Sequence, residues 1–271
     1  MKGKWLILLL AVTILGTAAA IWRPAPRETP PPSATTTANG TDKTSAPDNE
    51  SPAQAESAAR FAARLAEAKH AWQTDNDPVK AERLLQEALT MAHTDEQRFA
   101  AFAWRAELFD GRDNARQLAA GRAMRAIAHT PREQAAAGHI IARASEKMGD
   151  YRAAVTEYET AAGQYQKSGQ PDMARLNYAA AARLAMDKLH NGERGNALWK
   201  NAWQAVESAG MSDTDRAAAF YDLCLDQASF AAARKEYVEE LRWHREAARW
   251  QPSHAASVTA LEEAYRRQRK L

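Results

Sequence analysis

The chain has little of the residues on which disulfide scaffolds and metal sites depend. It has one cysteine, Cys224, among its 271 residues, so a disulfide within the chain is impossible. No cysteine follows the apolar run at the N-terminus, which argues against a lipid-anchored bacterial protein. The seven histidines are scattered, and neither HExxH nor CxxC occurs. We therefore expect no metal ion and no cofactor.

Signatures of the common catalytic sites are also lacking. The sequence contains neither a glycine-rich phosphate loop nor GxSxG. Neighbouring carboxylates such as Glu239 and Glu240 diverge around a helix, whereas an acid and base pair must converge. Cys224 lies between two leucines, which favours a small buried side chain over a nucleophile. We therefore expect a protein that is not an enzyme.

A strong excess of positive charge is missing as well. The formal net charge is +2, whereas a dedicated nucleic-acid-binding protein carries a clear basic excess. The basic end from Arg266 to Lys270 suits the negative pole of a helix dipole, with contact to lipid or nucleic acid as the alternative interpretation. We expect no nucleic acid among the partners.

Residues 1 to 22 contain the one long apolar run of the chain and are interpreted as a targeting segment. The run is bracketed by Trp5 and Trp22, and about 17 helical steps of about 1.5 Å between them span about 26 Å, close to a hydrocarbon core. These tryptophans would then lie at the two membrane interfaces. With Lys2 and Lys4 on the cytoplasmic side, the chain is predicted to be a single-pass protein of the inner membrane with its bulk in the periplasm.

A cleaved signal peptide is the competing interpretation of the same segment. Ala18 and Ala20 form a small-x-small site after a short apolar region, as signal peptidase requires. Cleavage there would give a secreted or periplasmic protein. The spacing of the two tryptophans favours the uncleaved anchor.

Residues 23 to 50 are rich in proline, threonine and serine and almost without large apolar side chains. Such a segment cannot bury a core and is predicted to be a disordered linker. A proline-rich chain is extended by up to about 3 Å per residue, so the linker would act as a stalk.

Residues 51 to 271 are predicted to form an all-helical domain. No strand-like alternation of polar and apolar residues occurs, and capping signals such as Thr94-Asp95-Glu96-Gln97 and Thr130-Pro131-Arg132-Glu133 recur. We expect helices near residues 52 to 73, 78 to 92, 95 to 109, 113 to 128, 131 to 147, 151 to 167, 171 to 190, 194 to 208, 213 to 229, 235 to 250 and 253 to 269.

The segment from Gly149 to Ala161 carries the clearest pattern in this domain. Gly149 allows a left-handed residue at the end of one helix, and Tyr151, Ala154, Tyr158 and Ala161 then follow at helical spacing on one face of the next. Alternating small and large side chains permit two helices to cross closely. This pattern resembles the second helix of a tetratricopeptide repeat (TPR).

Further copies of the pattern support the resemblance. Ala81, Leu85 and Ala88 repeat its spacing, Ala197 and Leu198 are aligned with Ala154 and Val155, and the pattern returns at Tyr237, Leu241, His244, Ala247 and Pro252. Lys235 and Glu240 depart from it, because the family has glycine and alanine there. The resemblance implies a divergent TPR-like α-solenoid: a right-handed superhelix of about five helical hairpins with a C-terminal capping helix, preceded by the N-terminal hydrophobic helix.

The resemblance also implies where a partner would bind. In the family the first helices of the hairpins line a concave groove, which suggests Trp104, His139, Arg143 and Glu146 as groove residues. The last three share one helix face by their spacing. Ordinary surface polarity, and packing in the case of the tryptophan, are the alternative interpretations.

These observations predict a non-catalytic, membrane-tethered scaffold that mediates protein–protein interaction or assembly in a bacterial cell envelope, with a protein or peptide in the groove. The first alternative is a helical accessory part of a peptidoglycan-acting enzyme, such as the solenoid of lytic transglycosylases, or a divergent enzyme of this kind. The second is a secreted solenoid that binds its partner in solution.

Overall fold

The computed structural model describes residues 52–268. The predicted anchor or signal peptide with Trp5 and Trp22, and the predicted linker, lie outside the described residues. Within residues 52–268 the chain is helical and contains no strand. The helices are α1 (Pro52–Gln73), α2 (Pro78–Met91), α3 (Asp95–Phe109), α4 (Asn114–Ala126), α5 (Pro131–Lys147), α6 (Tyr151–Lys167), α7 (Pro171–Asp187), α8 (Gly192–Glu207), α9 (Asp213–Ala233), α10 (Tyr237–Trp250), the 3₁₀ turn η2 (Pro252–His254) and α11 (Ala255–Arg267).

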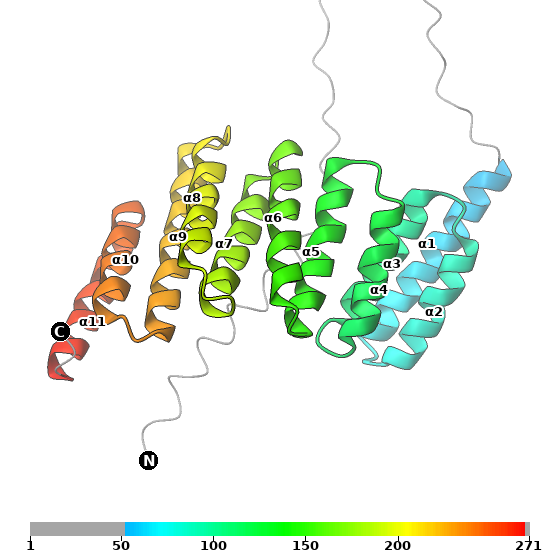
Figure 1. Ribbon diagram of the computed structural model, residues 1–271. Coiled ribbons are helices and arrows are strands. Elements are labelled where there is room, and N and C mark those ends of the chain that lie inside the picture. Colours follow the sequence, from blue (N-terminus) through cyan, green and yellow to red (C-terminus); the bar gives the residue numbers. More distant parts are fainter. Residues whose placement is uncertain (1–51, 269–271) are drawn as a thin grey trace, which may run out of the picture. The chain divides into compact units, whose positions relative to one another are not determined.

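Helices α1 to α10 pair in chain order into five antiparallel hairpins that lie side by side, and α11 packs on the last of them (Figure 1). The structure therefore confirms an all-helical array of hairpins consistent with a helical solenoid. Its helix bounds agree with the predicted ones to within a few residues; the largest differences are at the ends of α7 and α9.

The helix starts follow from the capping residues. The side chain of Thr94 accepts a hydrogen bond from the Gln97 amide, and the Gln97 side chain accepts one from the Thr94 amide. Thr130 and Glu133 form the same reciprocal pair at the start of α5. Each box satisfies amide groups that a helix end leaves without partners, and losing such a cap costs about 1 kcal/mol.

One residue with positive φ occurs in the turn of every hairpin. Gly111 and Gly149 take this position in the second and third hairpins, and the sequence predicted it for Gly149. Asn76, His190 and Lys235 take it in the other three, with φ of 52°, 51° and 61°. A residue with a Cβ atom is strained in this conformation, so these three turns are less stable than a glycine turn would be.

The predicted apolar face of α6 is buried in the largest core cluster. Ala154, Tyr158 and Ala161 are all less than 4% exposed, and they pack among side chains of α5, α7, α8 and α9. Many of the neighbours are alanines, which let the helix axes approach closely. Two smaller clusters join α1 to α3 and α3 to α5, so the core continues along the array.

The register predicted for α8 is wrong in one respect. Ala197, which the sequence pattern aligned with Ala154, is exposed. The close contact is made two residues earlier by Gly195, where an added Cβ would lie 2.2 Å from Cγ of Met186. Gly192, a residue type that often ends a helix, is instead the first residue of α8.

Ion pairs join successive second helices at intervals of about one repeat unit. Arg116 of α4 contacts Glu82 of α2, Arg125 of α4 contacts Glu157 of α6, and Arg194 of α8 contacts Glu159 of α6. The sequence separations are 34, 32 and 35 residues, close to the length of one hairpin unit. Exposed pairs of this kind each contribute about 0.2–1 kcal/mol, so they help to set the stacking register but do not drive it.

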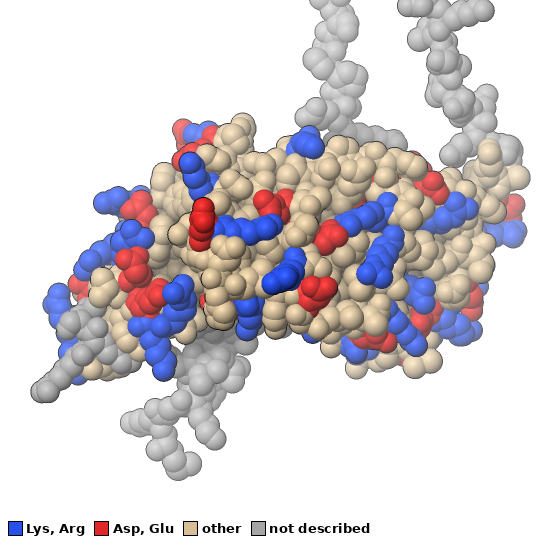
Figure 2. Space-filling view, in the orientation of Figure 1, with Lys and Arg blue, Asp and Glu red and all other residues tan. Residues whose placement is uncertain are grey.

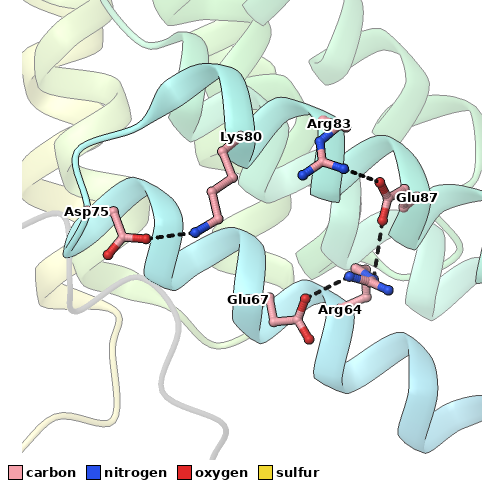
Figure 3. A network of polar contacts seen from close by, with 6 residues as sticks. All are labelled: Arg64, Glu67, Asp75, Lys80, Arg83 and Glu87. Carbon is pink, nitrogen blue, oxygen red and sulfur yellow. Dashed lines mark hydrogen bonds and ion pairs between the residues drawn. The ribbon is translucent and has the colours of Figure 1, made fainter.

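A further ion-pair network joins the two helices of the first hairpin (Figure 3). Arg64 lies between Glu67 on its own helix and Glu87 on α2, at 2.7 and 3.4 Å. Lys80, at the start of α2, contacts Asp75 in the turn at 3.0 Å. One of these contacts joins α1 to α2 and the other joins the turn to α2, so both help to hold the hairpin closed.

The step from the fourth to the fifth hairpin is longer than the earlier ones. Arg175 of α7 pairs with Asp222 of α9 across a sequence separation of 47 residues. An aromatic stack fills the space beside this step: Trp203 of α8 lies 4.9 Å from Phe220 of α9, which lies 4.6 Å from Trp250 of α10. Large aromatic side chains thus pack between the last two hairpins.

Candidate functional site

The four predicted groove residues lie on two first helices, Trp104 on α3 and His139, Arg143 and Glu146 on α5, and all four are half-buried. Each of them contacts another residue of the chain. They therefore take part in the structure of the array. The hydrogen-bond donors, acceptors and charges that they offer to a partner depend on the groups around them.

Arg143 belongs to a polar network centred on Asp110, at the C-terminal end of α3. It donates to Oδ2 of Asp110 at 2.6 Å, while Lys147 and Gln117 donate to Oδ1 at 2.6 and 3.0 Å. Burial alone would raise the pKa of Asp110, but the hydrogen bond from Lys147, the charge of Arg143 and the bond from Gln117 outweigh it and lower this pKa. The carboxylate therefore stays charged and locks the second hairpin to the third.

Glu146 accepts a hydrogen bond from the hydroxyl of Tyr158, at 2.9 Å. Burial raises the pKa of Tyr158 strongly, and the negative charge of Glu146 adds to this effect. Tyr158 is thus a permanent donor that orients the Glu146 carboxylate, whose remaining lone pairs can still accept from a partner.

His139 contacts Asn177 of α7, with 2.9 Å between Nδ1 and Oδ1. The amide nitrogen of Asn177 donates to the carbonyl of Met173, so its oxygen is the acceptor and the proton of the neutral imidazole lies on Nδ1. Burial lowers the pKa of His139; the contact with Asn177 opposes the shift and the charge of Arg143 increases it. Nε2 of this neutral ring is then a hydrogen-bond acceptor.

Trp104 is covered by Lys69 of α1, whose Nζ lies 4.4 Å from the ring centroid. Burial lowers the pKa of Lys69 and raises the pKa of Glu107, and the attraction between the two opposes both shifts. Glu107, one turn after Ala103 on α3, has no side-chain hydrogen bond and no ion pair within residues 52–268. The cation–π contact stabilises the indole by about 0.5–1 kcal/mol at a partly exposed site.

The sequence did not single out the residues that continue this face toward the C-terminus. Arg183 of α7 lies close enough to Tyr158 to influence its pKa, and close enough to Asp226 of α9 to lower the pKa of that carboxyl. Burial outweighs the cations Arg183 and Arg175, so the pKa of Asp226 is raised. Neither Arg183 nor Asp226 forms a side-chain hydrogen bond or ion pair with any other described residue.

These contacts link polar residues on successive first helices, and we call this set of residues the polar strip. It is defined by Lys69, Trp104, Glu107, Asp110, His139, Arg143, Glu146, Arg183, Asp222 and Asp226. It carries charges of both signs, and charges of both signs are also interspersed on the face shown in Figure 2.

The groups of the strip can donate hydrogen bonds, accept hydrogen bonds and pair with opposite charges. Among residues 52–268 no three His, Cys, Asp or Glu side chains converge as metal ligands would. Cys224 is buried, and burial raises the pKa of its thiol to about 12, so it is an unreactive core side chain.

None of the helices between residues 52 and 268 combines the length and apolar character that a membrane crossing requires.

Comparison of the chain with protein-family models, with curated proteins and with solved structures gave no match.

Proposed function

We propose that the chain is a non-catalytic scaffold of the TPR type, a right-handed superhelix whose first helices hold a protein or peptide partner. The observation that carries the proposal is the polar strip, which runs over α1, α3, α5, α7 and α9. An array of hairpins places these helices side by side, so their exposed faces add up to a long binding surface.

Three charged groups of the strip support this function. Glu107, Arg183 and Asp226 have no ion pair within 4 Å in the described part of the chain, although burial already disfavours the charged forms of the two acids. A partner that places opposite charges against them would favour their charged forms, because an opposite charge close by stabilises a charged group. Groups such as Arg143, which already has a partner in Asp110, would shape the surface.

Residues 1 to 22 are proposed to anchor the protein in the inner membrane, and residues 23 to 50 to hold the array away from it in the periplasm. The apolar run between Trp5 and Trp22, and the proline-rich composition after it, support this placement. Intact-mass measurement of the mature protein tests it. A chain that begins at Ile21 would replace the tether with a secreted or periplasmic form.

Charge reversal on the strip tests the binding function. The full-length tagged protein is used to recover partners from detergent-solubilised envelopes, and Arg183→Glu is compared with wild type and with Lys200→Glu, an exposed position on the second helix α8. We expect wild type and the control to recover the same protein, and Arg183→Glu to recover at least about tenfold less at unchanged helicity. Equal recovery by all three chains, or no specific protein with any of them, would reject the function.

A further inference from the structure

We propose that the C-terminal cap of the array is an acid-sensitive latch, closed by a contact between His244 and His254. Nδ1 of His244, on α10, lies 3.0 Å from Nε2 of His254, at the end of η2, and the two rings are stacked with centroids 5.2 Å apart. This contact joins the last hairpin to the segment that leads into α11, at the C-terminal end of Figure 1.

A third side chain extends the contact to α9. The hydroxyl of Tyr221 lies 3.3 Å from Nδ1 of His254, and the two rings meet edge to face at 5.4 Å. The row Tyr221–His254–His244 therefore connects α9, the cap segment and α10. Two imidazoles do not make a metal site, which needs further ligands that the described residues do not bring together here.

The number of protons on the two rings decides whether the contact persists. In the neutral pair one of the two facing nitrogens carries a proton and donates a hydrogen bond to the other. One added proton leaves this hydrogen bond intact. A second added proton places hydrogen on all four ring nitrogens. The facing N–H groups then repel each other, and two positive charges lie in stacked rings.

The surroundings of the histidine pair disfavour the binding of this second proton. Burial lowers the pKa of both histidines, and the charge of His254 lowers the pKa of His244 further. On α10 the negative charge of Glu240, one turn before His244, raises the pKa of His244 and so opposes these shifts. Glu240 already accepts a hydrogen bond from Tyr265 of α11.

The other charged groups near the cap do not offset the lowered pKa values of the two histidines. On α9 the neighbour of Tyr221 is Asp222, which is paired with Arg175. On the cap, Glu262 is paired with Arg245 of α10 at 2.7 Å. These carboxylates already have cationic partners, so they are poorly placed to neutralise a doubly protonated pair.

The cap itself is lightly held, so each of its contacts with α10, the histidine pair included, is a large share of what keeps it closed. Of the residues of α11 only Val258 and Tyr265 are buried, whereas helices inside the array bury up to nine. Segments with few buried apolar contacts open at low free energy. Opening would uncover the part of α10 that α11 contacts, including Tyr237 and Glu240.

The sign of the pH dependence follows from the lowered pKa values. The unfolded or open cap binds protons with the ordinary histidine pKa of about 6.5, and the closed cap binds them less readily. The contribution of the pair to closure is therefore complete above about pH 6.5. It is lost as the pH falls from there toward the lowered values, by about a factor of ten in the opening equilibrium for each pKa unit between the two states.

Hydrogen exchange of the full chain at pH 7.5 and pH 5.0 tests the latch, with labelling times corrected for the intrinsic exchange rate. The readout is the protection of residues 252–268 relative to α2. We expect acid to reduce the protection of the cap several-fold more than that of α2 in wild type. His254→Gln, which keeps a hydrogen-bonding side chain that does not titrate, should remove this difference. His93→Gln, an exposed histidine between α2 and α3, should behave as wild type.

An equal pH response of cap and α2 in wild type would overturn the proposal, and so would an unchanged acid response in His254→Gln. If the substitution opens the cap at both pH values, ring titration by NMR in wild type decides. Uptake of the second proton must then coincide with the loss of cap protection, and separate midpoints would overturn the proposal.

Discussion

Glycine-to-alanine substitutions at three helix positions should have opposite effects on stability, according to how closely the neighbouring helix approaches. At Gly195 an added Cβ would lie 2.2 Å from Cγ of Met186 and 3.3 Å from the carbonyl oxygen of Ala182. At Gly163, in the interior of α6, the nearest atom would be the Tyr178 hydroxyl at 4.0 Å, an ordinary contact.

The magnitudes follow from two opposing terms. Alanine is favoured over glycine in a helix interior by about 0.5–1 kcal/mol. Overpacking at a close contact costs about 1–3 kcal/mol, and the backbone oxygen of Ala182 cannot rotate away as a side chain can. Gly163→Ala should therefore stabilise the protein by about 0.5–1 kcal/mol, and Gly195→Ala should destabilise it by about 0.5–2 kcal/mol.

Gly121 provides a second close contact at a different hairpin step. Its Cβ would lie 2.9 Å from side-chain atoms of both Ile140 and Ile141 of α5, so Gly121→Ala should also be destabilising. If both Gly121→Ala on α4 and Gly195→Ala on α8 lower the free energy of unfolding, close packing is the shared cause and a peculiarity of one helix is excluded.

Urea unfolding followed by far-UV circular dichroism measures these effects, with Met186→Ala as the partner in a double-mutant cycle. If Met186 is the obstacle, Gly195→Ala should cost at least about 1 kcal/mol less in the Met186→Ala background. Stabilisation by all three alanines, or a cycle with no coupling, would refute the close packing of α7 and α8.

Three further outcomes follow from the structure. Lys235→Gly should raise the free energy of unfolding by about 0.5–1 kcal/mol, because Lys235 has a φ of 61°; a lower urea midpoint would contradict this. Tyr265→Phe should destabilise the cap by about 1–3 kcal/mol, since it leaves the buried carboxylate of Glu240 without its donor, and this loss should disappear in a Glu240→Ala background. His139→Gln should flatten the loss of stability below about pH 6.5 that the lowered pKa of this half-buried ring produces, as urea midpoints at pH 7.5 and 5.0 would reveal; an unchanged slope would contradict a neutral His139 in the folded protein.

Most of the helix bounds could be predicted because the signals are local. The boxes at Thr94 and Thr130 each lie within four residues and define their helix starts without any tertiary contact. The same is true of Gly149, whose positive φ ends α5. His190 and Lys235 were not predicted as left-handed residues, because residues with a Cβ atom disfavour that conformation and neither residue type signals it.

The candidate site could be predicted only in part. The spacing of His139, Arg143 and Glu146 places them on one face of α5, but their partners come from other hairpins. Asp110 and Asn177 lie 33 and 38 residues from the residues they bind, so no local pattern connects them.

The histidine pair shows the same limit. His244 and His254 are ten residues apart and looked scattered in the sequence. The break at Pro252 turns the chain so that η2 lies beside α10 and the two rings meet. Such contacts depend on the angle between two helices, which single-residue preferences do not determine.

Site-specific photo-crosslinking in cells tests most directly whether the polar strip is the surface that binds a partner. A photoreactive residue is placed at Glu107 or Leu176 on the first helices, or at Thr156 or Lys200 on the second helices, all of them exposed. Leu176 shares a face of α7 with Arg183, seven residues later. We predict one common crosslinked protein from the two first-helix positions and none from the second-helix positions. Crosslinks from the second helices alone, or from no position, would contradict the account.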